Sequence, residues 1–234
     1  MRQIFLDTET TGLESKLGHR IIEIAAVEMI NRTLTGRRFH NYLNPDRKVE
    51  AGALQIHGLT DDFLQDKQKF FDITNELLEF IDGAELIMHN APFDVGFLNN
   101  ELGLVKLKPL ENYCHSITDT LKMAKKLHPG KRNNLNALCE RYQINNSKRV
   151  LHGALLDAEL LAEVYLAITR GQESLVMEIS FPQSDINISP QDIELISLPA
   201  STEELELHTE QLELIDRESK GVCLWKNVEE ITTK

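Results

Sequence analysis

The chain has few cysteines, no long apolar stretch and no excess of positive charge. Its 234 residues include three cysteines, Cys114, Cys139 and Cys223, which lie far apart and without metal-ligand spacing. This odd number is typical of reduced thiols in a cytosol, and we expect each to be a small buried side chain. No stretch approaches the roughly 18–20 apolar residues of a membrane span, and the run Ile4–Leu6 before Asp7 is too short for a signal peptide. We therefore expect a cytoplasmic protein with no membrane partner.

The acidic residues are concentrated in the last quarter of the chain, and the rest is close to neutral. Residues 1–171 hold 21 Lys and Arg against 23 Asp and Glu, which gives −2, and residues 172–234 hold 4 against 14, which gives −10 of the total −12. Phosphates would repel the acidic tail. A nucleic acid bound to residues 1–171 would thus need metal ions, a second protein that holds it, or the basic cluster of Lys122, Lys125, Lys126, Lys131 and Arg132.

The order of the expected elements predicts a mixed α/β sheet flanked by helices. Three strands come first and form an antiparallel meander: around Ile4–Leu6, over Arg20–Ile30 and, after a turn at Asn31–Gly36, over Arg37–Leu43. Helices and short strands then alternate. We expect helices over Asp61–Gln65 and Thr74–Ile81, a buried strand at Glu85–His89, a helix after Asn90, a strand at Ser116–Thr118, and helices that begin near Asp119, near Asn133 or Asn134, and at Leu155.

The composition divides the chain into a domain over residues 1–171, a linker over 172–191 and a C-terminal segment over 192–234. The C-terminal segment pairs a short strand, Ile193–Leu198, with an amphipathic helix that begins at the capping box Ser201–Glu204 and runs to about Lys220. This unit is too small to build much core alone. Because Trp is common at interface hot spots, we expect docking on a partner protein through the apolar residues Leu212, Ile215 and Trp225.

Two carboxylates follow the first apolar run at a spacing of two residues. Side chains alternate between the faces of a strand, so Asp7 and Glu9 emerge on the same face. Two acids this close resist ionising together unless a cation compensates them. The pair therefore indicates one half of a divalent-metal site, although a charged strand edge or a turn capped by Asp7 would use the same residues. Two other acids fit other roles better than that of a further ligand: Glu23 a solvent-facing or core-edge position, and Asp119 a helix N-cap.

Further candidate ligands are Asp94 and Asp157, each near the start of an expected helix. Asp94 follows a buried strand, and ligand sites gather at strand ends in α/β sheets. His152 and Asp157 are five residues apart, a rotation of about 140° in a helix, so we place His152 just before the helix that carries Asp157. This arrangement suits a metal ligand on a rigid element and a proton acceptor on a looser one. Hard oxygen ligands without a nearby thiolate favour Mg²⁺ or Mn²⁺ over Zn²⁺.

Three motifs in order along the chain resemble one exonuclease family. They are Asp7-Thr-Glu9-Thr-Thr-Gly, His89-Asn90-x-x-Phe93-Asp94 and His152-x-x-x-x-Asp157. They are similar to the motifs of the His-type branch of the DEDD superfamily, the DnaQ-like 3′→5′ exonucleases with a ribonuclease-H-like fold. A closer resemblance, to the proofreading exonucleases of bacterial replicative polymerases, comes from the segments Gln55–Leu59, Pro129–Asn133, Asn146–Ala158 and Gly221–Lys226. The resemblance spans the whole chain and is weakest over roughly 172–200.

The resemblance implies an enzyme that removes mispaired 3′-terminal nucleotides from DNA by two-metal-ion hydrolysis. Asp7, Glu9, Asp94 and Asp157 would hold two Mg²⁺ or Mn²⁺ ions, which in such sites lie about 3.5–4 Å apart. His152 would act as the general base, since the ordinary pKa of histidine lies near 6.5. Water would attack the last phosphodiester and release a nucleoside 5′-monophosphate.

Substrate and partner contacts are also implied by the resemblance. The terminal nucleotide would meet Asp7, Glu9, Thr10, Leu13, Ile56, His57, Asn90, Phe93 and Asp157, although capping of a helix start is an alternative for His57. The partners would be a single-stranded 3′ end, the catalytic alpha subunit of the polymerase and the sliding clamp, the last through a weak peptide motif at Gln172, Leu175 and Met177. Two rival readings are a stand-alone exoribonuclease without a docking tail and a non-catalytic adaptor that has lost an acid or His152.

Overall fold

The computed structural model describes residues 1–147, 149, 151–170, 199–219, 221 and 225. The chain divides into two compact units, residues 1–177 and 178–234, and each is considered by itself. Within the described ranges, every helix is too short or too polar to cross a membrane.

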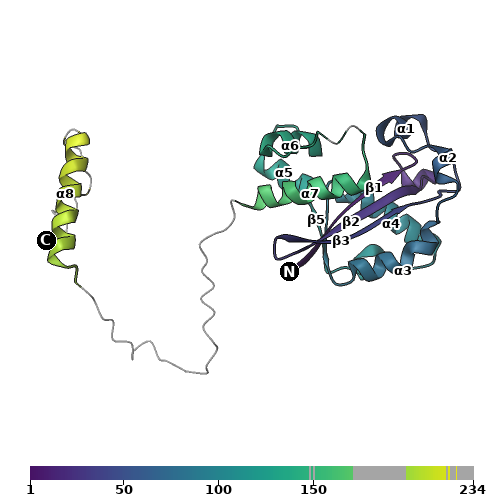
Figure 1. The fold of residues 1–234 in the computed structure, drawn as a ribbon, viewed down its shortest axis with the longest axis horizontal. Helices are drawn as coiled ribbons and strands as arrows, with labels where there is room; N and C mark the ends of the chain where they lie inside the picture. The colour runs from purple at the N-terminus through teal and green to yellow at the C-terminus, as the bar shows by residue number, and fades with distance from the viewer. Residues whose placement is uncertain (148, 150, 171–198, 220, 222–224, 226–234) are drawn as a thin grey trace, which may run out of the picture. The chain divides into compact units, whose positions relative to one another are not determined.

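The first unit is built on a five-stranded sheet in the order β3-β2-β1-β4-β5 (Figure 1). Neighbouring strands among β1, β2 and β3 pair antiparallel, and β4 and β5 extend the sheet in parallel with β1. This is the mixed sheet predicted from the sequence, and its central strand carries Asp7 and Glu9. The strands are β1 Arg2–Thr10, β2 Ile21–Ile30, β3 Thr33–Tyr42, β4 Glu85–Met88 and β5 Ser116–Asp119.

Helices cover both faces of the sheet. Figure 1 shows α5, α6 and α7 on one face and α3 and α4 on the other. The helices of this unit within the described residues are α1 Ala51–His57, α2 Asp61–Leu64, α3 Phe70–Ile81, α4 Ala91–Leu104, α5 Thr120–Leu127, α6 Leu135–Tyr142 and α7 Ala154–Thr169, with short 3₁₀ turns at Ser15–Leu17 and Leu110–Asn112.

The alternation of side chains along β1 divides the core into two clusters. Ile4 and Leu6 belong to the cluster formed with α3 and α4. Phe5 belongs to the cluster formed with α5, α6 and α7. Because side chains repeat every second residue in a strand, Asp7 and Glu9 share the face of Phe5 and point toward the layer of α7.

The hairpin between β2 and β3 is tighter than the sequence predicts. The turn expected over Asn31–Gly36 consists of Asn31 and Arg32, whose φ angles are 49° and 65°. Two consecutive residues with positive φ form the two-residue turn that matches the twist of a hairpin. Strand pairing therefore resumes at Thr33, opposite Ile30, and Gly36, with φ at 81°, lies inside β3.

Two helices differ from the prediction because their starts lack the usual capping signal. The helix expected from Thr74 begins at Phe70, since Asp72 caps it from inside its first turn by accepting the Lys69 N–H at 2.9 Å. Helix α1 is not predicted by the sequence pattern. It has no side-chain cap, and His57 is its one buried residue. The side chains of Thr60, Asp119 and Asn134 accept hydrogen bonds from the first turns of α2, α5 and α6. The N-cap expected at Asp119 is thus confirmed, and Asn134, not Asn133, caps α6.

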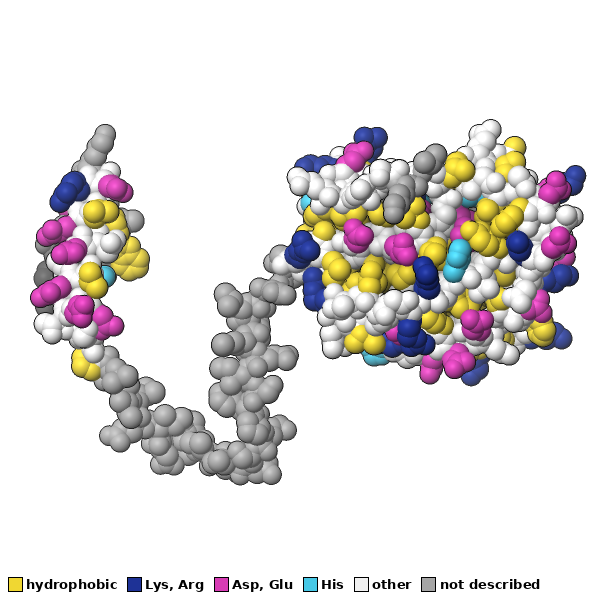
Figure 2. Space-filling view, viewed as in Figure 1, with side chains coloured by type: hydrophobic (Ala, Val, Ile, Leu, Met, Phe, Trp, Pro, Cys, Tyr) yellow, Lys and Arg dark blue, Asp and Glu magenta, His cyan; other side chains and the backbone are white. Residues whose placement is uncertain are grey.

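The second unit contains α8, Thr202–Glu218. Its start is the predicted capping box, in which the Ser201 hydroxyl accepts the Glu204 N–H and the Glu204 carboxylate accepts the Ser201 N–H. Figure 2 shows acidic and apolar side chains side by side on α8. Ile215 is 43% exposed and Trp225 is 71% exposed. The predicted linker, the strand Ile193–Leu198 and the clamp motif at Gln172, Leu175 and Met177 lie outside the described residues.

Candidate active site

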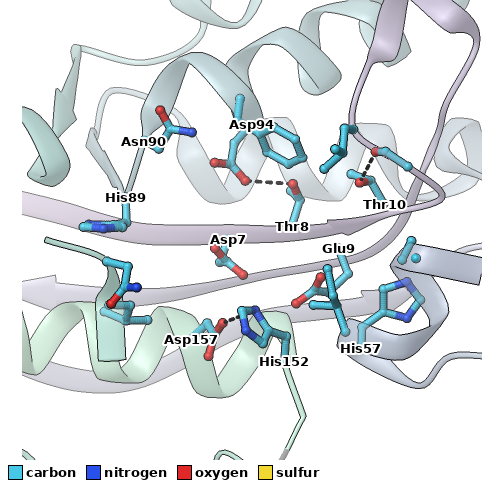
Figure 3. A pocket seen from close by; sticks show the side chains of 18 of the residues that line it. Asp7, Thr8, Glu9, Thr10, His57, His89, Asn90, Asp94, His152 and Asp157 are labelled. Atoms are coloured by element: carbon cyan, nitrogen blue, oxygen red, sulfur yellow. Dashed lines mark hydrogen bonds and ion pairs between the residues drawn. The ribbon is translucent and has the colours of Figure 1, made fainter. Parts of the chain in front are cut away.

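Strand β1 brings two carboxylates to the face of the sheet that α7 covers. Asp7 lies opposite Ala25 of β2 and Glu9 opposite Glu23, so both acids leave the same face (Figure 3). The predicted arrangement of the first motif is confirmed.

The motif ends at Gly12 because the turn after β1 has no room for a side chain. A Cβ at this position would lie 2.3 Å from the ring of His19. That ring is held between the Thr11 hydroxyl at 3.0 Å and the Glu50 carboxylate at 3.2 Å. The turn is thereby fixed against the start of α1, which positions Leu13, 76% exposed, at the rim of the site.

Asp94 reaches the same centre from the other layer. Strand β4 runs parallel to β1, and α4 begins directly after it, so Asp94 lies in the first turn of α4. The Thr8 hydroxyl donates to Asp94 Oδ1 at 2.7 Å, and Asp94 is 3% exposed (Figure 3). Asp119 Oδ1 accepts the Asn90 N–H at 3.1 Å and caps α5. Asp119 thus has the N-cap role that the sequence favours.

Helix α7 supplies Asp157, and the loop before it supplies His152. Asp157 is 4% exposed and lies in the first turn of α7. His152 Nδ1 lies 3.6 Å from Asp157 Oδ2, and the His152 side chain is 45% exposed. The His152 N–H donates to the Ile56 carbonyl of α1 at 3.0 Å. The position of His152 outside the helix, with Asp157 inside it, agrees with the prediction.

Arg149 is a site residue that the sequence reasoning missed. Its guanidinium donates two hydrogen bonds to Asp157, from Nε to Oδ1 and from Nη2 to Oδ2, each 2.5 Å long. The two side chains are each 5% exposed. Arg149 also donates to Asn136 Oδ1 at 2.8 Å and lies 3.0 Å from His152 Nδ1. Its presence in the family-like segment Asn146–Ala158 was the only available signal, because nothing in its spacing relative to the acids points to the site.

Burial and neighbouring carboxylates raise the pKa of Asp7, Glu9 and Asp94. Burial, followed by the charges of Asp94, Asp157 and Glu9, holds the pKa of Asp7 well above its usual range. Burial, together with the charge of Asp157, raises the pKa of Glu9 to about 8. Burial also raises the pKa of Asp94 to about 7. Arg149 acts in the opposite direction on Asp7 and Glu9. Such a cluster is stabilised by a cation.

The donor set fits a hard divalent cation. Glu9, His152 and Asp157 each offer one ligand atom within 4.8 Å of the others. Asp7 and Asp94 add carboxylates whose charges act on this group. Oxygen donors in this number are typical of Mg²⁺ or Mn²⁺ sites.

A cavity of about 510 Å³ opens beside the acids. Its lining mixes the charged centre with apolar side chains at the rim, and Ile56 is 45% exposed there. Every residue predicted to act as a metal ligand, a base or a substrate contact in the first unit lines this one cavity, namely Asp7, Glu9, Thr10, Leu13, Ile56, His57, Asn90, Phe93, Asp94, His152 and Asp157.

His57 does not cap the start of a helix, which was the alternative role that the sequence left open for it. His57 is the last residue of α1 and is 5% exposed. Its Nδ1 accepts the Leu59 N–H at 3.0 Å, which leaves the proton of the neutral ring on Nε2. Burial lowers the pKa of His57. The neutral ring therefore lines the wall of the cavity with its Nε2 buried.

Glu23 lies next to the site but has its own partner. It is 3% exposed, and its Oε1 lies 2.8 Å from His40 Nε2. The charge of Glu23 contributes to the raised pKa of Glu9. Of the two roles that the sequence left open, solvent-facing or core-edge, the structure shows the core-edge one.

Comparison with known proteins gives a family for this site. The profile described as "Exonuclease" matches residues 4–165. DNA polymerase III subunit epsilon of Salmonella typhimurium is 51% identical over 237 residues, which cover 96% of this chain and 97% of the relative. The subunit epsilon of Escherichia coli is 48% identical over 237 residues with the same coverage.

The chain belongs to the exonuclease family, among the DNA polymerase III epsilon subunits. It is accordingly a 3′–5′ exonuclease of the proofreading type. Exonucleases of this family generally use divalent metal ions, which agrees with the donor set of the cavity.

Solved structures of exonucleases share the fold of the first unit. Exonuclease X in complex with 5′-overhanging duplex DNA is 25% identical with a TM-score of 0.58, covering 73% of this chain and 92% of that one. The nuclease domain of 3′hExo, a DEDDh family member bound to rAMP, is 19% identical with a TM-score of 0.63 and the same coverage. The second similarity concerns the fold alone, and both agree with the predicted ribonuclease-H-like sheet.

Proposed function

We propose that this epsilon-type exonuclease hydrolyses the last phosphodiester of a mispaired DNA 3′ end by two-metal-ion chemistry, with His152 as the general base. The observation that supports the proposal best is the convergence of four carboxylates from β1, α4 and α7 on one cavity beside a half-exposed histidine. Structural carboxylates are normally paired or exposed. These acids lie close to one another in a partly buried centre, and a bound cation would stabilise them.

Asp7, Glu9, Asp94 and Asp157 are the residues that would hold two Mg²⁺ or Mn²⁺ ions. When bound, such ions stabilise the charge on the attacking and leaving oxygens of an in-line displacement. Thr8 supports this set from the opposite face of β1, since its hydroxyl donates to Asp94 and fixes the orientation of that carboxylate.

His152 would take the proton from the attacking water. Burial and the neighbouring Arg149 lower its pKa, so the imidazole is neutral at pH 7. It could take up a proton at Nδ1 once the hydrogen bond from Arg149 is released. Its loop position leaves the ring partly exposed to the cavity, where water and a substrate phosphate have access.

Each predicted substrate residue at the cavity wall would make a different contact with the nucleotide. Leu13 and Ile56 are exposed apolar side chains that would pack against the terminal base. Phe93 would pack against the sugar. The Thr10 hydroxyl already donates to the Gly12 carbonyl at 2.7 Å, so we assign its contact with the nucleotide to its backbone and methyl group. His57 would line the pocket around the base and sugar, and Asn90 would hydrogen-bond the sugar or phosphate.

Selection of mispaired ends follows from the cost of separating the strands. A mismatched terminal nucleotide is cheaper to unpair than a matched one. The cavity would therefore receive frayed ends more often than paired ones. The near-neutral first unit does not attract phosphates strongly, which suits an enzyme whose substrate is held by a partner.

We assign the C-terminal segment to docking on the alpha subunit of DNA polymerase III in the cytoplasm. Leu212 lies on α8 with the exposed Ile215, and Trp225 follows the helix as another exposed apolar side chain. The acidic residues around them would keep this surface away from DNA. The clamp motif at Gln172, Leu175 and Met177 is proposed to bind the sliding clamp. Gln172→Ala should weaken clamp binding and leave activity on free single strands intact, and equal clamp affinities would contradict this assignment.

The deciding experiment measures release of nucleoside 5′-monophosphates from a 3′-mispaired primer. Wild type with Mg²⁺ should release them, and wild type without divalent ions should not. His152→Ala should lose about 10²–10⁴-fold in rate, the usual contribution of a general base. His208→Ala, a change at an exposed residue of α8, is the matched control and should behave as wild type.

Two arms of this experiment separate the rival functions. A matched single-stranded RNA should be a poorer substrate than DNA; preference for RNA would favour the exoribonuclease. Absence of metal-dependent release in the wild type would favour the non-catalytic adaptor and contradict the proposal.

A further inference from the structure

The guanidinium of Arg149 lies inside the acid cluster. Both oxygens of Asp157 accept hydrogen bonds from it, in the parallel two-bond geometry that is the strongest form of an arginine–carboxylate pair. Both side chains are 5% exposed. The pair is therefore a buried ion pair at a carboxylate of the proposed metal site.

Arg149 is held by partners beyond Asp157. Asn136 of α6 accepts a hydrogen bond from Nη1 at 2.8 Å, and the Asn146 amide donates to the same Asn136 oxygen at 3.3 Å. Nη2 lies 3.0 Å from His152 Nδ1. Since arginine has no acceptor, it is the donor in this contact, and His152 Nδ1 is occupied by a hydrogen bond. Arg149 thus engages the proposed base together with the proposed ligand.

An arginine cannot lose its charge to relieve a crowded site. Its positive charge acts on Asp7 and Glu9 as well as on Asp157, because both acids interact favourably with it. Arg149 therefore supplies part of the positive charge that the buried acids require. A divalent ion at the same acids would supply the same compensation, would need oxygens of Asp157 that the guanidinium occupies, and would repel the guanidinium.

We propose that Arg149 is a built-in counter-ion that competes with the divalent metal for Asp157, so that metal binding displaces it from both Asp157 and His152. This inference rests on the proposed metal ligands. The protein without metal would be a closed resting state, with Asp157 neutralised and the base engaged. Binding of metal at the four acids would also release His152 from Arg149. The base could therefore act only when the cations are present.

The test is the affinity for Mn²⁺ of the full-length protein without DNA, measured by titration calorimetry. Arg149→Gln keeps a hydrogen-bonding side chain but removes the charge. It should bind the first Mn²⁺ on the order of tenfold more tightly than wild type, equivalent to about 1.4 kcal/mol. In the absence of divalent ions it should also have a lower Tm than wild type, and Mn²⁺ should raise its Tm by more than it raises that of wild type.

Two further variants make the comparison decisive. Arg2→Gln removes an arginine that pairs with the buried Glu28 at 2.7 Å, at the opposite end of β1 from the acids. It should lower the Tm without changing Mn²⁺ affinity. Arg149→Lys keeps the charge but loses the two-bond fork, so its Mn²⁺ affinity should fall between wild type and Arg149→Gln. If Arg149→Gln does not fold, tighter binding by Arg149→Lys than by wild type is the supporting result.

The outcomes distinguish this inference from the proposed function. If wild type binds Mn²⁺ and the Arg149 variants bind it equally or more weakly, the counter-ion role is wrong. The proposed metal site would not be affected by that result. Absence of Mn²⁺ binding by wild type, with the same result for Asp7→Ala, would overturn the metal site itself.

Discussion

Replacing Glu9 by glutamine should make the metal-free protein more stable while removing a proposed metal ligand. Glu9 is 8% exposed, and its carboxylate lies among the charges of Asp157, Glu23 and Asp94. An isosteric amide keeps the packing and removes the charge that burial opposes. The same substitution would therefore raise the free energy of unfolding and weaken metal binding.

The magnitude follows from the raised pKa of Glu9. The group titrates at about 8 in the folded protein, against 4.5 ordinarily. Each pH unit between these values is worth about 1.36 kcal/mol, so at pH 7 the ionisable group costs the folded state about 3 kcal/mol. Glutamine removes most of this cost, and we expect a gain of about 2–3 kcal/mol. For a unit of this size that corresponds to a rise in Tm of about 5–10 °C.

The sign of the pH dependence is fixed by which state binds the proton more tightly. Between pH 4.5 and about 8 the folded protein keeps a proton on Glu9 that the unfolded chain has released. Unfolding is then favoured by rising pH, so the stability contributed by Glu9 falls across this window. The stabilising effect of Glu9→Gln should be near zero at pH 4.5, should grow steadily, and should level off above pH 8.

Urea unfolding at pH 5, 7 and 8 without divalent ions measures the effect. Glu14→Gln, the same charge change at an exposed position, is the control and should stay within about 0.5 kcal/mol of wild type. Addition of Mg²⁺ should stabilise wild type more than Glu9→Gln, so the difference between them shrinks or reverses. A stabilisation by Glu9→Gln that is independent of pH, or a loss of stability at pH 8, would refute the reasoning.

Three further changes test separate parts of the site. His152→Ala should lower kcat on single-stranded DNA by about 10²–10⁴-fold and leave Mn²⁺ affinity no weaker than in wild type; calorimetry that shows a large loss of affinity would make His152 a ligand instead. Thr8→Val removes the hydroxyl that donates to Asp94, so we expect Mn²⁺ to bind about tenfold more weakly and the free energy of unfolding to fall by about 1–2 kcal/mol; unchanged calorimetric affinity would contradict a role for this hydrogen bond. Leu13→Ala shortens an exposed side chain and should raise KM for DNA several-fold, with a Tm within 2 °C of wild type. If kcat instead falls several-fold while KM stays constant, Leu13 acts in the chemical step.

The parts of the fold that the sequence predicts are those with a local physical signal. Asp7 and Glu9 are found on one face because a strand alternates its side chains. Asp119 is found as a cap because an acid before a helix accepts the free N–H groups of its first turn. His152 is placed outside α7 because helical rotation excludes an inward position for both it and Asp157.

The parts that the sequence does not predict depend on contacts between distant elements. Helix α1 has one buried residue, so its sequence shows no helical repeat of apolar residues by which it could be predicted. Its C-terminal end nevertheless forms one wall of the cavity. Arg149 is a loop residue whose role exists only because Asp157 and Asn136 meet it in space. Spacing along the chain carries no information about such a contact.

The four acids of the site are all organised by the register of one strand. Asp7 and Glu9 reach the centre directly, and Phe5, on the same face, packs in the cluster that includes α7, the helix that carries Asp157. Thr8, between the two acids, points to the opposite face and bonds Asp94 of α4. A slip of β1 by one residue would exchange these faces: the acids would turn toward α4, and Thr8 would turn toward α7. Since the apolar core on both faces fixes this register, the free energy that folds the sheet is also what holds the mutually repelling carboxylates together in the absence of metal.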